Sequence, residues 1–262
     1  METHVDFSQI SSVALIVLFS GFLQGAVAFG FGLLSVPLLL MVGLPVPTVL
    51  AVSSLCTAVQ AASGVHHLRQ AVPWKDVGVC LAIRVVAMLL GIWALLALVR
   101  FPMSQIKFWI GLVTLLLVVL QASWQPRPRA RLHGCWNLAA FTASGFTGGL
   151  CAIGGPPLVL WVMAHDWDAE RTRAFLFASF MSLVPFQLVV LYWTFGHDVL
   201  RGMILGAALS PVVLLGSVAG LRVGARFPKP LLRRLAFLVL AAIALNAMYP
   251  QVAHLLRGGH VP

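Results

Sequence analysis

Charged residues are scarce in this sequence. Only 9% of its 262 residues are Asp, Glu, Lys or Arg, and 60% are apolar, whereas a soluble domain carries about 25% charged residues. The mean hydropathy of +0.98 agrees with this composition. Once the long hydrophobic segments are removed, too little polar sequence is left for a soluble catalytic domain. The composition therefore excludes a soluble protein and predicts an integral membrane protein.

The sequence also lacks the alternation of apolar and polar residues that a membrane-spanning strand requires. Its apolar runs are long and continuous, so we expect helical spans and an all-α, polytopic membrane fold. Cysteine is rare, and the cysteines show no CxxC spacing. They indicate neither disulfides nor a metal site, and no cofactor is expected. The four cysteines are Cys56, Cys80, Cys135 and Cys151.

Acidic residues are fewer than basic ones, seven against seventeen, which gives a net charge of +10. The basic residues fall mainly in short loops between hydrophobic segments, where positive charge sets membrane topology. We therefore expect the lipid bilayer, and no nucleic acid, as the partner of this charge. The N-terminal sequence METHVDFSQI lacks the basic region of a cleaved signal peptide, so the first hydrophobic segment is expected to stay in the mature protein.

Two stretches that lie 124 residues apart are versions of one another. Residues 20–32 are SGFLQGAVAFGFG and residues 144–156 are SGFTGGLCAIGGP, with six of thirteen positions identical. The tripeptide Arg-Phe-Pro recurs in the same way, at 100–102 and 226–228. A duplicated unit with a glycine-broken hydrophobic segment in each copy is typical of transporters that bind substrate at the breaks.

The duplication predicts two repeats, 1–123 and 135–262, joined by a basic cytoplasmic linker at 124–134. Each repeat contains five hydrophobic segments, and the second segment of each is too short to cross a core about 30 Å thick. We expect these two segments to be half-helices that return from the breaks, followed by three full crossings. An odd number of crossings inverts the second repeat relative to the first. The expected segments are 10–29, 33–43, 47–65, 77–98, 107–123, 135–153, 157–164, 172–195, 199–220 and 231–249.

The basic residues test this layout. With the N-terminus outside, twelve of them fall on the cytoplasmic side and four outside, with Arg84 in the membrane. If each half-helix were merged with the next segment, the basic linker would lie outside, so the positive-inside rule favours the first arrangement. The cytoplasmic set is Arg69, Lys75, Arg127, Arg129, Arg131, Arg171, Arg173, Arg222, Arg226, Lys229, Arg233 and Arg234, and the outer set is Arg100, Lys107, Arg201 and Arg257.

The breaks are the candidate substrate site. In the second copy, two glycines and two prolines at 154–157 precede an apolar run. Proline suits the first turn of a helix, so a half-helix is expected to begin at Pro156 or Pro157. Residues 30–32 take this place in the first copy. Two helix N-termini that face each other bind an anion without a charged side chain.

The alternative is that these glycines only let helices pack closely. Gly21 and Gly25, and likewise Gly145 and Gly149, have the small-xxx-small spacing of such contacts. Both roles can coexist, with the earlier glycines packing and the later ones forming the break.

Arg84 is the only charged side chain well inside a hydrophobic segment. An intramembrane arginine is costly and marks a pathway or a partner, and all seven acids lie in tails or loops. Arg84 either binds an anion or extends its side chain to the headgroups. The alignment places Ser210 opposite it in the second repeat. The candidate substrate-binding set is Gly30, Gly32, Gly154, Gly155, Pro156, Gln24, Thr147 and Arg84.

The paired motifs SGFLQGAVAFGFGLLSVPLL and SGFTGGLCAIGGPPLVL resemble those of the sulfite exporter TauE/SafE family of bacterial membrane permeases. The resemblance covers nearly the whole chain, and the motif with GGPP is the more specific of the two. It implies export of a small sulfur-containing anion, such as sulfite or an organosulfonate, across a bacterial inner membrane. It also implies that the protein is not an enzyme.

Other functions fit the sequence less well. An intramembrane hydrolase needs a nucleophile and a base at one depth, but the eight histidines lie in tails, loops or segment ends. A receptor or assembly factor would need a soluble part that the chain lacks. Anion uptake and ion-coupled transport by the same fold stay open as alternatives to export.

Overall fold

The computed structural model describes residues 7–27, 29–124, 126, 128–129, 132–227 and 229–256. Within these residues the structure consists of helices and their connections, with one isolated β-bridge between Arg129 and His165. The helices are α1 (Phe7–Val27), α2 (Phe31–Met41), α3 (Val46–Leu68), α4 (Trp74–Leu98), α5 (Met103–Ser123), α6 (Gly134–Cys151), α7 (Gly155–Met163), α8 (Ala169–Phe195), α9 (His197–Ala208), α10 (Ser210–Arg226) and α11 (Lys229–Leu256).

All ten predicted segments correspond to helices, and the all-α prediction is confirmed. The segment predicted at 199–220 differs, because it consists of two helices, α9 and α10, bent by 53°. The bend has a local cause at Pro211, which lies in the first turn of α10. Proline has no N–H to continue the helical ladder, and its ring clashes with the preceding turn.

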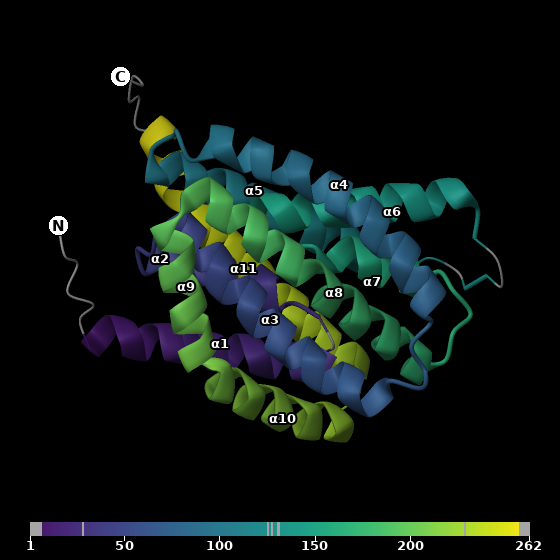
Figure 1. Ribbon diagram of the computed structural model, residues 1–262. Coiled ribbons are helices and arrows are strands. Elements are labelled where there is room, and N and C mark those ends of the chain that lie inside the picture. The colour runs from purple at the N-terminus through teal and green to yellow at the C-terminus, as the bar shows by residue number, and fades with distance from the viewer. Residues whose placement is uncertain are drawn as a thin grey trace.

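The helices form a bundle in which several cross at large angles, and the two ends of this bundle differ (Figure 1). α1 begins and α11 ends at the left of the view, whereas the connection between α5 and α6 lies at the right. At that right-hand end the rings of Trp124 and Trp136 are 4.9 Å apart. Arg129 exchanges backbone hydrogen bonds there with Ala164 and Asp166. We call this end, which also carries the turn between α7 and α8, the linker end.

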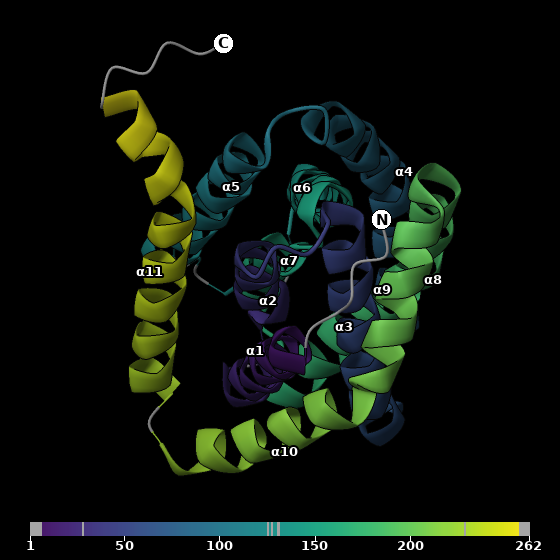
Figure 2. The same cartoon turned by 90° about the vertical axis from the view of Figure 1, so that its left-hand side faces the viewer.

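The two short helices occupy the centre. Figure 2 shows α2 and α7 surrounded by the other helices. At 11 and 9 residues, they span about 16 Å and 14 Å, too little for a bilayer core of about 30 Å. Both are apolar around most of their circumference and are buried along most of their length. This agrees with the predicted half-helices, which begin two residues earlier than expected.

Glycines bring the long helices into close contact. A Cβ on Gly21 would lie 2.7 Å from the carbonyl oxygen of Val213, so α1 packs on α10. A Cβ on Gly145 would lie 2.5 Å from the carbonyl oxygen of Arg84, so α6 packs on α4. The predicted packing role of these glycines is confirmed. Val213 of α10 packs against Gly21 in the way that Arg84 of α4 packs against Gly145.

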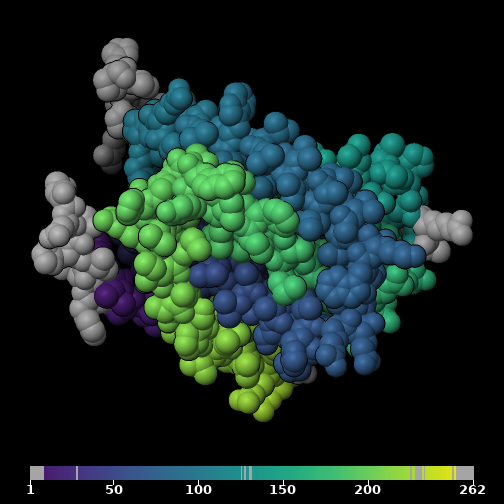
Figure 3. Space-filling view, in the orientation of Figure 1, coloured from purple at the N-terminus to yellow at the C-terminus, as the bar shows by residue number. Residues whose placement is uncertain are grey.

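The outer surface is apolar. Large hydrophobic side chains are exposed on the peripheral helices, among them Trp93 at 74% and Trp193 at 80%. Figure 3 shows one such face, where α3 lies between α8 and the α9–α10 pair and is bordered by α4. Among the described residues, five helices are long and apolar enough to cross a membrane, or six if the bent pair is one span. Such a surface is suited to lipid, and the chain is a multi-pass membrane protein.

The native cysteines offer a test of the predicted orientation. Cys135 is exposed at the linker end, whereas Cys56, Cys80 and Cys151 are buried. If the linker end is cytoplasmic, a membrane-impermeant maleimide should leave Cys135 unmodified in intact cells and modify it in inside-out vesicles. A matched variant, Cys135→Ser with Ser104→Cys, moves the exposed thiol to the opposite end and should give the reverse pattern. Labelling of Cys135 in intact cells would contradict the inverted arrangement.

Candidate functional site

In each break between a long and a short helix, a described residue has a positive φ. Gly30 has a φ of 103° and caps the N-terminus of α2. Ala152, at the end of α6, has a φ of 55°. A positive φ is easy for glycine and costs an alanine of order 1 kcal/mol, so the surrounding structure must hold Ala152 in place. α2 then begins at Phe31 and α7 at Gly155.

The two breaks touch one another. A Cβ on Gly32 would lie 2.5 Å from the carbonyl oxygen of Ala152, so no other residue fits at 32 without separating the breaks. A side chain of α6 stabilises the second break: the hydroxyl of Ser144 donates a hydrogen bond of 2.6 Å to the carbonyl of Gly154. The N-termini of α2 and α7 therefore meet in the core of the bundle.

A small cavity of ≈ 60 Å³ lies between the breaks. A water-sized probe occupies about 10–15 Å³, so the cavity has room for roughly four to six such spheres. Seven of the eight residues predicted for the substrate site line it. The lining residues are Gln24, Phe29, Gly30, Phe31, Gly32, Leu33, Ser54, Thr57, Arg84, Gly148, Ala152, Ile153, Gly154, Gly155, Pro156, Phe180, Leu183, Val184 and Gln187.

The two helix N-termini differ in what they present to this cavity. In α2 the first helical hydrogen bond is donated by Leu34 to Gly30, which leaves the N–H groups of Phe31, Gly32 and Leu33 without a helical acceptor. In α7 the second and third residues are prolines, which have no N–H. Only the first residue of α7 can donate, so α2 supplies most of the backbone donors.

Arg84 approaches the α7 side, where those backbone donors are missing. Its side chain is 2% exposed, and its Nη1 donates to the carbonyl oxygen of Ser179. Its Nη2 would lie 3.2 Å from a Cβ on Gly154. The guanidinium is therefore turned into the protein, and the alternative that it reaches the headgroups is wrong. Its Nε has no hydrogen-bond partner among the described residues.

No carboxylate of the described residues accompanies this charge. The described acids are in loops or in the first turn of a helix: Asp76, Asp166, Asp168, Glu170 and Asp198. A buried guanidinium without a counter-ion is expensive, because desolvation is not repaid by a nearby negative charge. The described residues thus leave a buried positive charge beside the cavity without a carboxylate partner.

Of the eight predicted site residues, Thr147 alone does not line the cavity. Its hydroxyl donates to the carbonyl of Ala143, 2.8 Å away on its own helix. Residues not in the predicted set take part instead. Ser54 and Thr57 of α3 line the cavity, and their spacing in a hydrophobic segment is a signal that could have located them. Gln187 of α8 lines it too and donates to the carbonyl of Gly148 at 2.9 Å.

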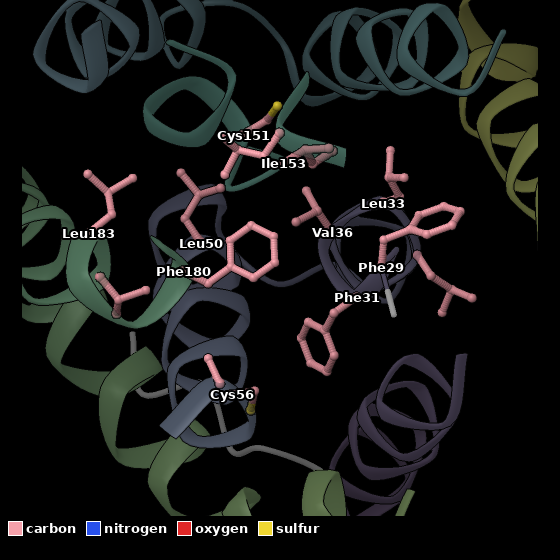
Figure 4. Packing of buried hydrophobic residues seen from close by; sticks show 14 of the residues in the cluster. Phe29, Phe31, Leu33, Val36, Leu50, Cys56, Cys151, Ile153, Phe180 and Leu183 are labelled. Carbon is pink, nitrogen blue, oxygen red and sulfur yellow. The ribbon is translucent and has the colours of Figure 1, made fainter. Parts of the chain in front are cut away.

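Two lining side chains besides Arg84 have unsatisfied polar atoms. Nε2 of Gln24 and Oγ of Ser54 are buried and have no hydrogen-bond partner among the described residues. Aromatic rings enclose the same space, and Figure 4 shows Phe180 reaching from α8 toward α2, with Phe31 on the same side of α2. Unsatisfied donors inside an apolar wall favour a small polar ligand.

A helical membrane fold with a cavity between two broken helices is typical of a membrane transporter. The profile of the family described as "Sulfite exporter TauE/SafE" matches residues 13–247, and the chain belongs to this family. It is therefore a transporter and not an enzyme. A curated relative, the probable sulfite/organosulfonate exporter TauE of Cupriavidus necator, is 26% identical over 238 residues, which cover 88% of this chain and 91% of the relative. No solved structure matches the chain.

Gly155 permits a graded test of the cavity. A Cβ at this position would meet only Cζ of Phe180, at an ordinary contact distance of 3.6 Å. Gly155→Ala should therefore retain transport of ³⁵S-sulfite in proteoliposomes, whereas Gly155→Leu should fill the cavity and abolish it. Both variants should still be monodisperse in detergent. Normal transport by Gly155→Leu would show that the cavity is not on the substrate path.

Proposed function

We propose that this protein exports a small sulfur-containing anion, of the sulfite or organosulfonate class, across a bacterial inner membrane. The anion binds between the two breaks, near the middle of the bilayer. The observation that carries the proposal is the buried, carboxylate-free guanidinium of Arg84 beside a cavity that the N-terminus of α2 also faces. A bound anion compensates both positive groups at once.

The substrate class follows from the size and polarity of the cavity. A volume of ≈ 60 Å³ suits an ion with few heavy atoms, and the lining offers hydrogen-bond donors on several sides. Backbone N–H groups come from α2, the guanidinium comes from α4, and Gln24 and Ser54 add side-chain donors. A compact oxyanion has acceptors in all directions and matches this set. The name of the relative from Cupriavidus necator supports the sulfur-containing class.

We propose further that the two halves form an inverted repeat. Helix contacts are exchanged between the halves in matching fashion, since α1 packs on α10 and α6 packs on α4. Within each half, a glutamine of the third helix donates to a carbonyl of the first: Gln60 to Gly21 at 3.2 Å, and Gln187 to Gly148 at 2.9 Å. These paired contacts support a common ancestral unit with the substrate between its two copies.

The driving force in this proposal is the membrane potential. Proton relays in membranes use Asp, Glu or His, and no described residue of these types lines the cavity. An anion that leaves a cell with a negative interior gains about 2.3 kcal/mol per charge per 100 mV. That gain supports more than a tenfold gradient, so export needs no second ion. Ion-coupled transport and uptake by the same fold are the competing functions.

Arg84 is the first residue to test. Arg84→Gln should weaken ³⁵S-sulfite transport and binding at least about tenfold, because a charge-assisted hydrogen bond contributes about 1.5–3 kcal/mol. Arg84→Lys should keep part of the activity, since charge matters more than fork geometry for a single small anion. Size-exclusion chromatography checks that both variants fold. Wild-type affinity in a folded Arg84→Gln variant would contradict the proposed site.

The driving force is tested separately. Wild-type proteoliposomes loaded with ³⁵S-sulfite are given a potassium-diffusion potential with valinomycin, without a pH or sodium gradient. Efflux should accelerate when the interior is negative and slow when it is positive. Efflux that ignores the potential but follows an imposed proton or sodium gradient would establish the ion-coupled alternative.

A further inference from the structure

Two larger cavities adjoin the site cavity on the side of the linker end. The first, of ≈ 550 Å³, lies between the last turns of α1, α7 and α10 and the first turns of α8. The second, of ≈ 350 Å³, lies between α1, α3, α8 and α10. Neither belongs to the ligand site described above.

Shared lining residues connect these cavities to the site. Phe29 lines both the first cavity and the site cavity, and Gln24 lines both the second cavity and the site cavity. Gly25 and Leu221 line both of the larger cavities. The larger cavities therefore lie next to the site cavity, with Gln24 and Phe29 at the boundary.

Arg173 lines both of the larger cavities and does not line the site cavity. Among the described residues that line the larger cavities, it is the one Asp, Glu, Lys or Arg. Its neighbour Arg171 is engaged elsewhere, 3.8 Å from a carboxylate oxygen of Asp76 and 4.5 Å from the ring centre of Trp167. No such partner holds Arg173 within the described part of the chain.

We propose that these two cavities form a vestibule in which Arg173 captures anions and directs them to the buried site. This inference rests on the proposed function, because it assumes that an anion travels between the linker end and the breaks. A cleft with apolar walls and charge of one sign concentrates oppositely charged solutes and raises their association rate by about 10–10³-fold. Arg173 is exposed, so its charge stays hydrated and acts on the rate of entry, whereas buried Arg84 acts on the affinity of the site.

The test separates entry from binding. In proteoliposomes at low ionic strength, Arg173→Gln should lower kcat/KM for ³⁵S-sulfite about three- to tenfold, and Arg173→Lys should retain the wild-type value. The difference between Arg173→Gln and wild type should vanish near 1 M potassium gluconate, where the Debye length is about 3 Å. The equilibrium Kd for sulfite, measured on the detergent-solubilised protein, should change less than twofold in Arg173→Gln.

Two control variants match Arg173→Gln in charge. Arg171→Gln and Arg69→Gln each remove an exposed arginine of the linker end that does not line the vestibule. Both should keep the wild-type kcat/KM at every salt concentration. The vestibule proposal is overturned if they lose as much as Arg173→Gln, or if the loss in Arg173→Gln is independent of salt.

Failure of the vestibule is distinguishable from failure of the proposed function. If Arg84→Gln loses sulfite affinity while Arg173→Gln behaves as wild type in every assay, only the vestibule is refuted. If the wild-type protein neither binds nor transports sulfite, the proposed function fails and this inference fails with it.

Discussion

The structure at the centre of this protein depends on positive groups that are buried among the helices. Three backbone N–H groups at the start of α2 and the guanidinium of Arg84 face one small cavity, and the described residues place no carboxylate beside them. Unpaired donors and charges are costly in an apolar environment. The carbonyl of Ser179 satisfies part of the guanidinium, and the remaining cost favours an anion. In the proposed function, this uncompensated positive charge would contribute to the binding of the anion.

Backbone packing fixes the direction of that guanidinium. A Cβ on Gly145 would lie 2.5 Å from the Arg84 carbonyl, and one on Gly149 would lie 2.2 Å from the Met88 carbonyl. α4 and α6 are therefore in backbone contact along this stretch, and the side chain of Arg84 is held at the break that ends α6. Helix packing and ligand binding are not separate uses of glycine here. The packing glycines of α6 place the cation, and the glycines of the break make room beside it.

The sequence was sufficient to predict the helices, the two breaks and seven of the residues that line the cavity, because glycine and proline act locally on the backbone. It could not predict the direction of Arg84, since snorkelling and inward burial differ only in tertiary packing. Thr147 was predicted from its place in the motif, but the helical phase turns its hydroxyl onto its own backbone. The bend at Pro211 was missed because the hydrophobic run continues through it.

The two short helices differ in the backbone donors that they offer at the breaks. Two prolines give α7 a well-defined start but remove the N–H groups that α2 retains. Arg84 approaches this depleted side, and the packing counterpart of Arg84 in the other half is the apolar Val213. The first half thus contributes both the backbone donors, from α2, and the cation, from α4. The second half contributes α7, which shapes the cavity but offers few donors. A symmetric pair of fully charged ends would bind an anion from both sides and hold it tightly, whereas transport requires that it leave again. In the proposed site, the scarcity of backbone donors on the α7 side weakens the hold on the anion and so favours its release.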